Sequence, residues 1–322
     1  MLWKKATRIA LHDLGGLAAL RWRHRSQFRI LMFHKFTASS CANTEAICEH
    51  IARYFEPIAL SRVSSALDGQ SLLPQNAVAV TIDDGYKNFL DYGHPIFRKY
   101  HIPTTVYIVS GFSGGRLWLW FDQIEFALEH TPRRSLQVAV DGRTFEFLLG
   151  SEERNFAAHT TLVEALKVMP NHARLEFVAR FGALCHVDIP AEPPTHFAAM
   201  SWNDLRAAAA EGVEIGCHTE THPILSRVSE PRELERETRG AKEVIEERLG
   251  FPVHHFCYPN GRDIDIGDAA LKAVRAAGYD SAVTTTWGLN TKRSDPMSLR
   301  RVPFSETLDL RYGAELLVGL HM

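Results

Sequence analysis

The sequence has no Cys-x-x-Cys pair, and its five cysteines are scattered along the chain. An odd number of dispersed cysteines is typical of reduced thiols in a cytosolic protein, so a disulfide-stabilised secreted domain is not expected. The 322 residues carry a formal net charge of −2. This gives no bulk attraction to nucleic acid, and no nucleic-acid partner is predicted. No internal repeat or low-complexity tract is present, so a single globular protein is expected.

Long apolar runs are missing too. No segment has the length and hydrophobicity of a transmembrane helix, and Arg8, His12 and Asp13 interrupt the apolar part of the N-terminus, which is therefore unlike a secretory signal. Residues 1–27 instead form a basic segment with apolar residues near helical spacing. Two alternatives stay open for it: peripheral contact with an anionic membrane, or packing as a helix on the main domain, where Gly15-Gly16 would weaken it. The expected location is the cytoplasm, with the inner membrane face as the alternative.

What the sequence does have is a regular alternation of strand-like and helical patterns. Eight short apolar runs predict strands, at 28–34, 55–60, 76–83, 104–109, 213–218, 254–259, 280–285 and 298–304. Helical patterns lie between them, the longest at 229–249. This order predicts an α/β fold with a mostly parallel sheet and crossover helices, and seven or eight strands favour a barrel over an open sheet. The sequence alone leaves closure of the barrel open.

The stretch 112–200 interrupts this alternation. Within it, residues 136–149 alternate on both sides of Asp141-Gly142, which predicts a β-hairpin, and helical patterns flank the hairpin. We therefore expect a barrel over residues 28–322 with an insertion at about 112–200 beside the site.

Two adjacent carboxylates, Asp83 and Asp84, follow the strand predicted at 76–83. In α/β barrels the active site lies at the rim where strands end and loops begin. Two like charges side by side repel each other unless a positive group stands beside them, and a divalent metal would serve. A helix N-cap with a solvated neighbour is the alternative reading of this stretch.

A second polar segment, "GCHTETHP", follows the strand predicted at 213–218. His218 and His222 are four residues apart, but Glu220 is not in the position of a zinc-protease glutamate, and Pro223 disfavours a helix at His222. The pair is therefore expected on a loop. Two histidines and one aspartate would form a three-ligand site with open positions, which is the pattern of a catalytic metal.

The segments "TIDDGY", "HTETHP" and "FCYPNG" resemble the motifs of carbohydrate esterase family 4, the polysaccharide deacetylases with the NodB homology domain. The resemblance covers roughly residues 28–110 and 200–304. It implies a deformed (β/α) barrel and metal-dependent removal of acetyl from an N-acetylated sugar. It also implies that Asp84, His218 and His222 are the metal ligands and that Asp83 is the general base. Zn²⁺ is the metal most expected for such ligands, with Co²⁺, Ni²⁺, Fe²⁺ or Mn²⁺ as alternatives.

The chemistry is consistent with these roles. A bound metal lowers the pKa of its water and polarises the acetyl carbonyl, and Asp83 would take the proton from that water. The resemblance assigns a backbone N–H of Tyr258 to the resulting oxyanion. A core aromatic before the turn at 259–261 is the alternative reading of Tyr258.

The general acid is assigned to His34, at the end of the first predicted strand. The stretch "ILMFHKF" resembles the permuted members that act on poly-N-acetylglucosamine and related exopolysaccharides, with Phe33 in place of a tyrosine. The arginine usual in the third motif is missing, so Arg301 is expected to approach the base instead. Asp295 is expected to pair with His34. Surface ion pairs would explain Arg301 and Asp295 equally well.

The predicted function is removal of an N-acetyl group from an amino sugar in a polysaccharide or a glycan precursor, and the predicted partner is that N-acetylated saccharide. Two alternatives remain. One is a deacylase or amidase that acts on an O-acetyl ester or a cyclic amide through the same metal chemistry. The other is a catalytically silent carbohydrate-binding protein, which the presence of all four aspartate and histidine residues disfavours.

Overall fold

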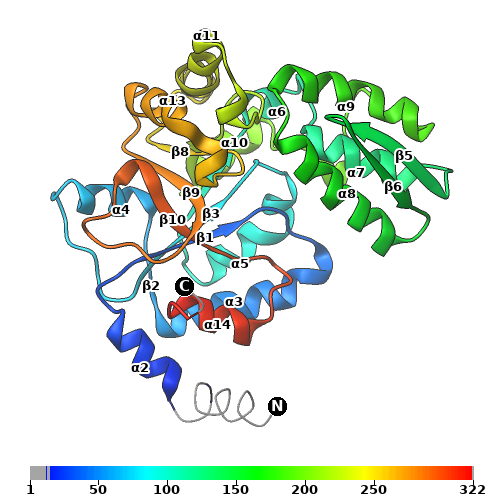
Figure 1. The fold of residues 1–322 in the computed structure, drawn as a ribbon. Helices are drawn as coiled ribbons and strands as arrows, with labels where there is room; N and C mark the ends of the chain where they lie inside the picture. Colours follow the sequence, from blue (N-terminus) through cyan, green and yellow to red (C-terminus); the bar gives the residue numbers. More distant parts are fainter. Residues whose placement is uncertain (1–11, 13–14, 321–322) are drawn as a thin grey trace.

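The computed structural model describes His12 and residues 15–320. Seven parallel strands form a closed ring, in which β1 pairs with both β10 and β3 (Figure 1). In ring order the strands are β1 (Arg29–Phe33), β10 (Leu299–Pro303), β9 (Ser281–Trp287), β8 (His255–Cys257), β7 (Glu214–Cys217), β4 (Thr104–Ile108) and β3 (Ala77–Ile82). The two-residue strand β2 (Glu56–Pro57) pairs with β3. The predicted α/β barrel is confirmed, and its ring closes with seven strands.

Each of the eight runs predicted as strands overlaps one of these strands. The helices that surround the ring are α3 (Cys41–Tyr54), α4 (Leu60–Leu67), α5 (His94–Lys99), α6 (Ser110–Ser113), α10 (Trp202–Ala210), α11 (Pro231–Glu235), α12 (Ala241–Leu249), α13 (Asp263–Ala276) and α14 (Leu310–Leu317). The long helix predicted at 229–249 is interrupted. A π-helical turn, η5 (Arg236–Gly240), separates α11 from α12.

Side chains alternate between the two faces of each strand, and this alternation decides which residues reach the interior of the barrel. On β3, Val78, Val80 and Ile82 pack in the large apolar layer between strands and helices. Ala77 and Ala79 belong to a smaller cluster with residues of β8, β9 and β10, inside the ring. The inner positions therefore carry small or polar side chains toward the end of the strand, where chemistry becomes possible.

The chain between β4 and β7 contains a separate group of elements, at the upper right of Figure 1. They are α7 (Trp120–His130), β5 (Ser135–Val140), β6 (Arg143–Leu148), α8 (Glu152–Lys167) and α9 (Asn171–Cys185). The strands β5 and β6 form the antiparallel hairpin that Asp141-Gly142 predicts. Buried residues of these elements form their own apolar cluster, which includes Leu136, Leu162 and Phe181. We refer to this part as the insertion.

Before β1 lies the short helix α2 (Gly16–Arg23), on which Leu17 and Leu20 pack against the barrel core. The amphipathic pattern predicted for residues 1–11, 13 and 14 lies outside the described residues. Within the described part of the chain, no helix has the length and apolar character needed to cross a bilayer.

Candidate metal and catalytic site

Five strands carry the polar residues of the site on or directly after their inner faces. Asp83 directly follows β3, and the alternation of side chains along this strand directs it into the barrel. His34 directly follows β1 and His218 directly follows β7, and both are directed inward for the same reason. Cys257 of β8 and Arg301 of β10 also occupy inner positions, and Arg301 is fully buried. A register shift between Leu299 and Arg301, against β9, accompanies this inward placement. Strand parity and ring closure therefore bring residues from positions 34 to 301 to one rim.

Asp84, His218 and His222 form a compact buried group. The Asp84 Oδ1 atom lies 3.5 Å from His218 Nε2 and 3.4 Å from His222 Nε2, and all three side chains are at most about 6% exposed. The Nδ1 atom of His218 donates to the Cys257 carbonyl oxygen at 2.7 Å, which directs Nε2 toward Asp84. This is the arrangement in which an imidazole presents a lone pair to a metal.

The donor atoms fit a small divalent cation. Metal bonds of about 2.1 Å at tetrahedral angles place neighbouring donors about 3.4 Å apart, which matches the two separations from Asp84. Burial lowers the pKa of His222 to about 3, so this imidazole is neutral, as a ligand must be. The set of one carboxylate and two imidazoles suits zinc and other first-row metals.

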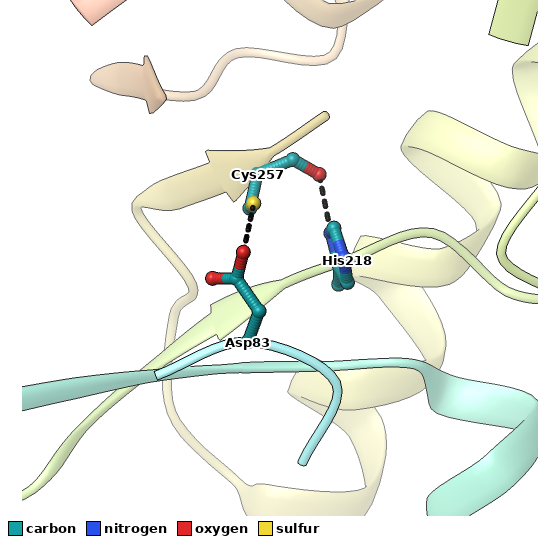
Figure 2. Close-up of side chains that lie close together, drawn as sticks. All are labelled: Asp83, His218 and Cys257. Atoms are coloured by element: carbon teal, nitrogen blue, oxygen red, sulfur yellow. Dashed lines mark hydrogen bonds between the residues drawn. The ribbon is translucent and has the colours of Figure 1, made fainter. Parts of the chain in front are cut away.

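Asp83, His218 and Cys257 form a second group of close donor atoms (Figure 2). The carboxylate of Asp83 is already engaged, because Arg301 Nη1 and Nη2 donate to its two oxygens at 2.6 and 2.7 Å. The Cys257 thiol lies 3.5 Å from Asp83 Oδ2 and 3.3 Å from Arg301 Nη2. In the second group, hydrogen bonds from Arg301 and Cys257 hold the Asp83 carboxylate in place. The group of Asp84, His218 and His222 is therefore the better candidate for a cation site.

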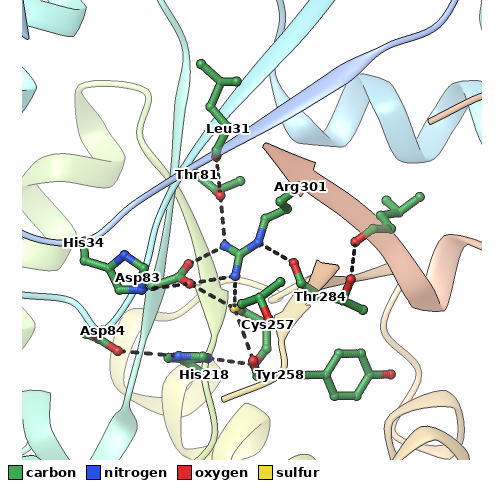
Figure 3. A network of polar contacts seen from close by, with 12 residues as sticks. Leu31, His34, Thr81, Asp83, Asp84, His218, Cys257, Tyr258, Thr284 and Arg301 are labelled. Carbon is green, nitrogen blue, oxygen red and sulfur yellow. Dashed lines mark hydrogen bonds and ion pairs between the residues drawn. The ribbon is translucent and has the colours of Figure 1, made fainter. Parts of the chain in front are cut away.

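Arg301 determines the charge state of Asp83. Burial alone would raise the pKa of Asp83, but the charge and hydrogen bonds of Arg301 offset this effect and hold the pKa below its ordinary value. The arginine is itself held by Thr284 and Thr81 (Figure 3). Asp83 is thus kept ionised and fixed in orientation, as a proton acceptor requires.

His34 lies on the open side of Asp83. Its Nε2 atom is 3.7 Å from Asp83 Oδ2, and its side chain is 46% exposed, whereas the side chain of Asp83 is 3% exposed. Figure 3 shows its ring directed toward Asp83 from the end of β1. Of the residues in this group, His34 is therefore the one with direct access to a molecule that approaches from solvent.

The loop that carries the two histidines is held by Glu237, a residue that the sequence did not single out. Its fully buried carboxylate accepts hydrogen bonds from the backbone N–H groups of Glu220 and Thr221, both at 2.9 Å, and from the Thr221 hydroxyl at 2.6 Å. Thr219 and His222 in this loop have positive φ angles of 71° and 57°. Such a backbone persists only when its surroundings hold it. Glu237 lies in the π-helical turn η5, a feature that often marks functional sites.

The insertion also contributes to the rim. Asp122 of α7 is buried, forms an ion pair with Lys35 at 2.9 Å, and accepts a hydrogen bond from the Tyr86 hydroxyl at 2.7 Å. Lys35 follows His34 in the chain. The ring of Phe121, also on α7, packs edge-on against His222 with 5.2 Å between centroids. The first turn of α7 therefore contacts both sides of the candidate site.

The structure corrects two predictions. The Tyr258 N–H is directed to the Val283 carbonyl at 3.2 Å in the pairing of β8 with β9, and the Tyr258 hydroxyl donates to Met297, so this residue does not offer a free donor to an oxyanion. Asp295 does not pair with His34, although the sequence predicted this pairing. It forms an ion pair with Arg275 and accepts a hydrogen bond from the Met297 N–H at the start of a 3₁₀ turn. Arg301, in contrast, approaches Asp83 as expected.

Residues 189–282 match a family model described as polysaccharide deacetylase. This range includes the histidine segment and "FCYPNG", but not the aspartate pair. No curated protein is similar enough in sequence to match. The resemblance to the polysaccharide deacetylases that the motifs indicated is confirmed for this part of the chain.

Several solved structures share the fold over most of this chain. The Streptococcus pyogenes deacetylase PplD in complex with acetate has 15% identity and a TM-score of 0.59, over 90% of this chain and 98% of that chain. IcaB from Ammonifex degensii has 15% identity and a TM-score of 0.57, over 91% and 98% of the two chains. The BpsB deacetylase domain from Bordetella bronchiseptica has 16% identity and a TM-score of 0.54, over 87% and 96%. The likeness is one of fold, and it extends over both the barrel and most of the remaining chain.

Proposed function

We propose that the protein is a metal-dependent hydrolase that removes the N-acetyl group from an amino sugar in a polysaccharide or a glycan precursor. The main observation behind this proposal is that two adjacent carboxylates, Asp83 and Asp84, have different surroundings. Asp84 faces two imidazoles at metal-ligand spacing, and Asp83 is held ionised by Arg301 beside it. The family match and the fold likeness support the same reaction class.

Asp84, His218 and His222 would hold the metal, which when bound lowers the pKa of water and polarises a carbonyl oxygen. Asp83 accepts a proton from the attacking water, because its oxygens are fixed by Arg301 and its charge is retained. His34 donates a proton to the leaving nitrogen as the carbon–nitrogen bond breaks. The water oxygen ends in acetate and the sugar nitrogen ends as an amine.

The test is release of acetate from N-acetylated glucosamine oligomers and from O-acetylated sugars, before and after treatment with a chelator. We expect release from the N-acetylated substrates, loss of activity on chelation, and recovery with Zn²⁺ or another first-row metal. Asp83→Asn should abolish turnover and leave metal binding within a few-fold. Release only from O-acetylated sugars, or activity that survives Asp83→Asn, would refute the proposal. The cytoplasmic location stays a prediction, which cell fractionation can test.

A further inference from the structure

The first 25 residues differ in charge from the rest of the chain. They contain six lysine or arginine residues against one aspartate, a net of +5, so the remaining 297 residues sum to −7 for the chain total of −2. Three of the six basic residues, Arg21, Arg23 and Arg25, lie in or directly after α2 in the described part of the chain. It has no part in the chemistry proposed above.

The helix α2 has apolar residues on two faces. Leu17 and Leu20 pack against the barrel core, as the folded domain requires. Ala18, Ala19 and Trp22 point the other way, and Trp22 is 66% exposed. The guanidinium of Arg25 lies 4.2 Å from the centre of the Trp22 ring, so aromatic and positive groups occur together on this exposed part of the chain.

The neighbouring helix α14 extends this surface. It contacts α2, and it carries the exposed residues Arg311 and Tyr312, the latter 43% exposed. A cavity of about 330 Å³ between α2, α3 and α14 is lined in part by Arg21 and Arg311. We refer to the following residues as the basic end surface: Arg21, Trp22, Arg23, Arg25, Arg311 and Tyr312.

We propose that the basic end surface binds an anionic phospholipid bilayer. Tryptophan and tyrosine are the side chains preferred at the level of the lipid headgroups, and each arginine near an anionic leaflet is attracted to it. In the sequence of α2, an arginine stands on each side of Trp22, at Arg21 and Arg23. A second copy of the chain fits this surface less well, because a symmetric contact would bring the arginines of both copies together.

Figure 1 shows α2 at the lower left, on the other side of the barrel from the insertion. The Arg25 carbonyl accepts a hydrogen bond from Asn76, immediately before β3, and Arg29 at the start of β1 donates to the Leu317 carbonyl of α14. Asp83 and His34 follow the other ends of these two strands. A bilayer on the basic end surface would therefore leave the catalytic rim open to the aqueous phase. The proposal does not depend on the proposed function.

The experiment is co-sedimentation of the full chain with vesicles of phosphatidylcholine alone or with 30% phosphatidylglycerol added, at about 0.1 and 0.5 M salt, where screening differs strongly. The variant Trp22→Ala/Arg23→Ser removes one ring and one charge from α2. Arg311→Ser tests the surface from α14, independently of how α2 folds. The matched control is Arg154→Ser/Phe156→Ala on the insertion, because Arg154 is exposed and Phe156 is 70% exposed.

We expect binding to the anionic vesicles only, and weaker binding at the higher salt. Arg311→Ser should lower the partition coefficient about fivefold, and the α2 variant should lower it more, since each charge contributes about 1 kcal/mol near an anionic surface. The control should bind like the unaltered chain. Equal binding to neutral vesicles, no binding to anionic ones, or unchanged binding of both surface variants would overturn the proposal. Self-association that the surface variants abolish, without vesicle binding, would assign the surface to a second copy instead.

Discussion

Replacing Glu237 with glutamine would test how the histidine loop is prepared for a metal. The carboxylate of Glu237 receives two backbone N–H groups on one oxygen and the Thr221 hydroxyl on the other. Glutamine keeps one acceptor oxygen but loses the charge, and its amide group must face the hydroxyl. We expect unfolding to become easier by about 1.5–3 kcal/mol, the usual contribution of a hydrogen bond to a charged group.

Without the Glu237 carboxylate, we expect the loop that carries His218 and His222 to change its backbone conformation. Thr219 and His222 have left-handed backbone conformations, which cost about 1–3 kcal/mol each and persist only when they are held in place. Relaxation would move His222 Nε2 away from its position 3.4 Å from Asp84. Loss of a group that orients a metal ligand typically weakens metal affinity about 10- to 100-fold, and we expect a loss in this range.

The assay is titration of the metal-free protein with Zn²⁺ in a calorimeter, with urea unfolding measured in parallel. Glu235→Gln is the matched control, because Glu235 lies two residues away and its side chain is 63% exposed. Activity of the Glu237 variant should recover at saturating metal. If Glu237→Gln binds Zn²⁺ as tightly as the control while its stability falls, the carboxylate supports the fold and not the ligand geometry.

Three further predictions concern the catalytic rim. Arg301→Leu leaves the buried Asp83 without its counter-charge and should lower the free energy of unfolding by about 3–5 kcal/mol in urea denaturation; a loss under 1 kcal/mol would show that the carboxylate finds another partner. His34→Gln should lower kcat on an N-acetyl amide about 10²- to 10⁴-fold but change hydrolysis of an activated aryl acetate little, since a phenolate leaves without protonation; equal losses on both substrates would remove His34 from the role of acid. Burial raises the pKa of Asp122 from 3.8 to about 7, so the folded state keeps a proton that the unfolded chain has released, and stability falls as the pH rises between about 4 and 8. Asp122→Asn should remove up to about 4 kcal/mol of this dependence in denaturation curves at several pH values, whereas a Glu125→Gln control that does the same would refute the assignment.

Much of the fold could be predicted because its signals are local. Each strand is a short apolar run, and the Asp141-Gly142 turn specifies the hairpin of the insertion. The residues that follow the strands were found for the same reason, since parallel strands end at one rim. The sequence left two possibilities for Arg301, a contact with Asp83 or a surface ion pair. The two hydrogen bonds from its guanidinium to the Asp83 carboxylate depend on closure of the strand ring.

The missed residues depend on features that no short pattern encodes. Glu237 reaches the histidine loop through a π-helical turn in the middle of a long helical pattern. The sequence predicts that Asp295 pairs with His34, but Asp295 forms its ion pair with the nearby Arg275 instead. Strand parity is a further signal in the sequence. It separates Cys257, which faces the interior with Asp83, from Tyr258, which packs in the outer layer.

The closure of the ring through β1 has a consequence for how the chain acquires its structure. β1 lies between β3 and β10, and β10 ends at residue 303. During synthesis one edge of β1 stays unpaired until β10 has emerged, and such an exposed edge favours pairing with other chains. Arg301 arrives on that same last strand, so the carboxylate of Asp83 acquires its counter-ion only as the barrel is completed.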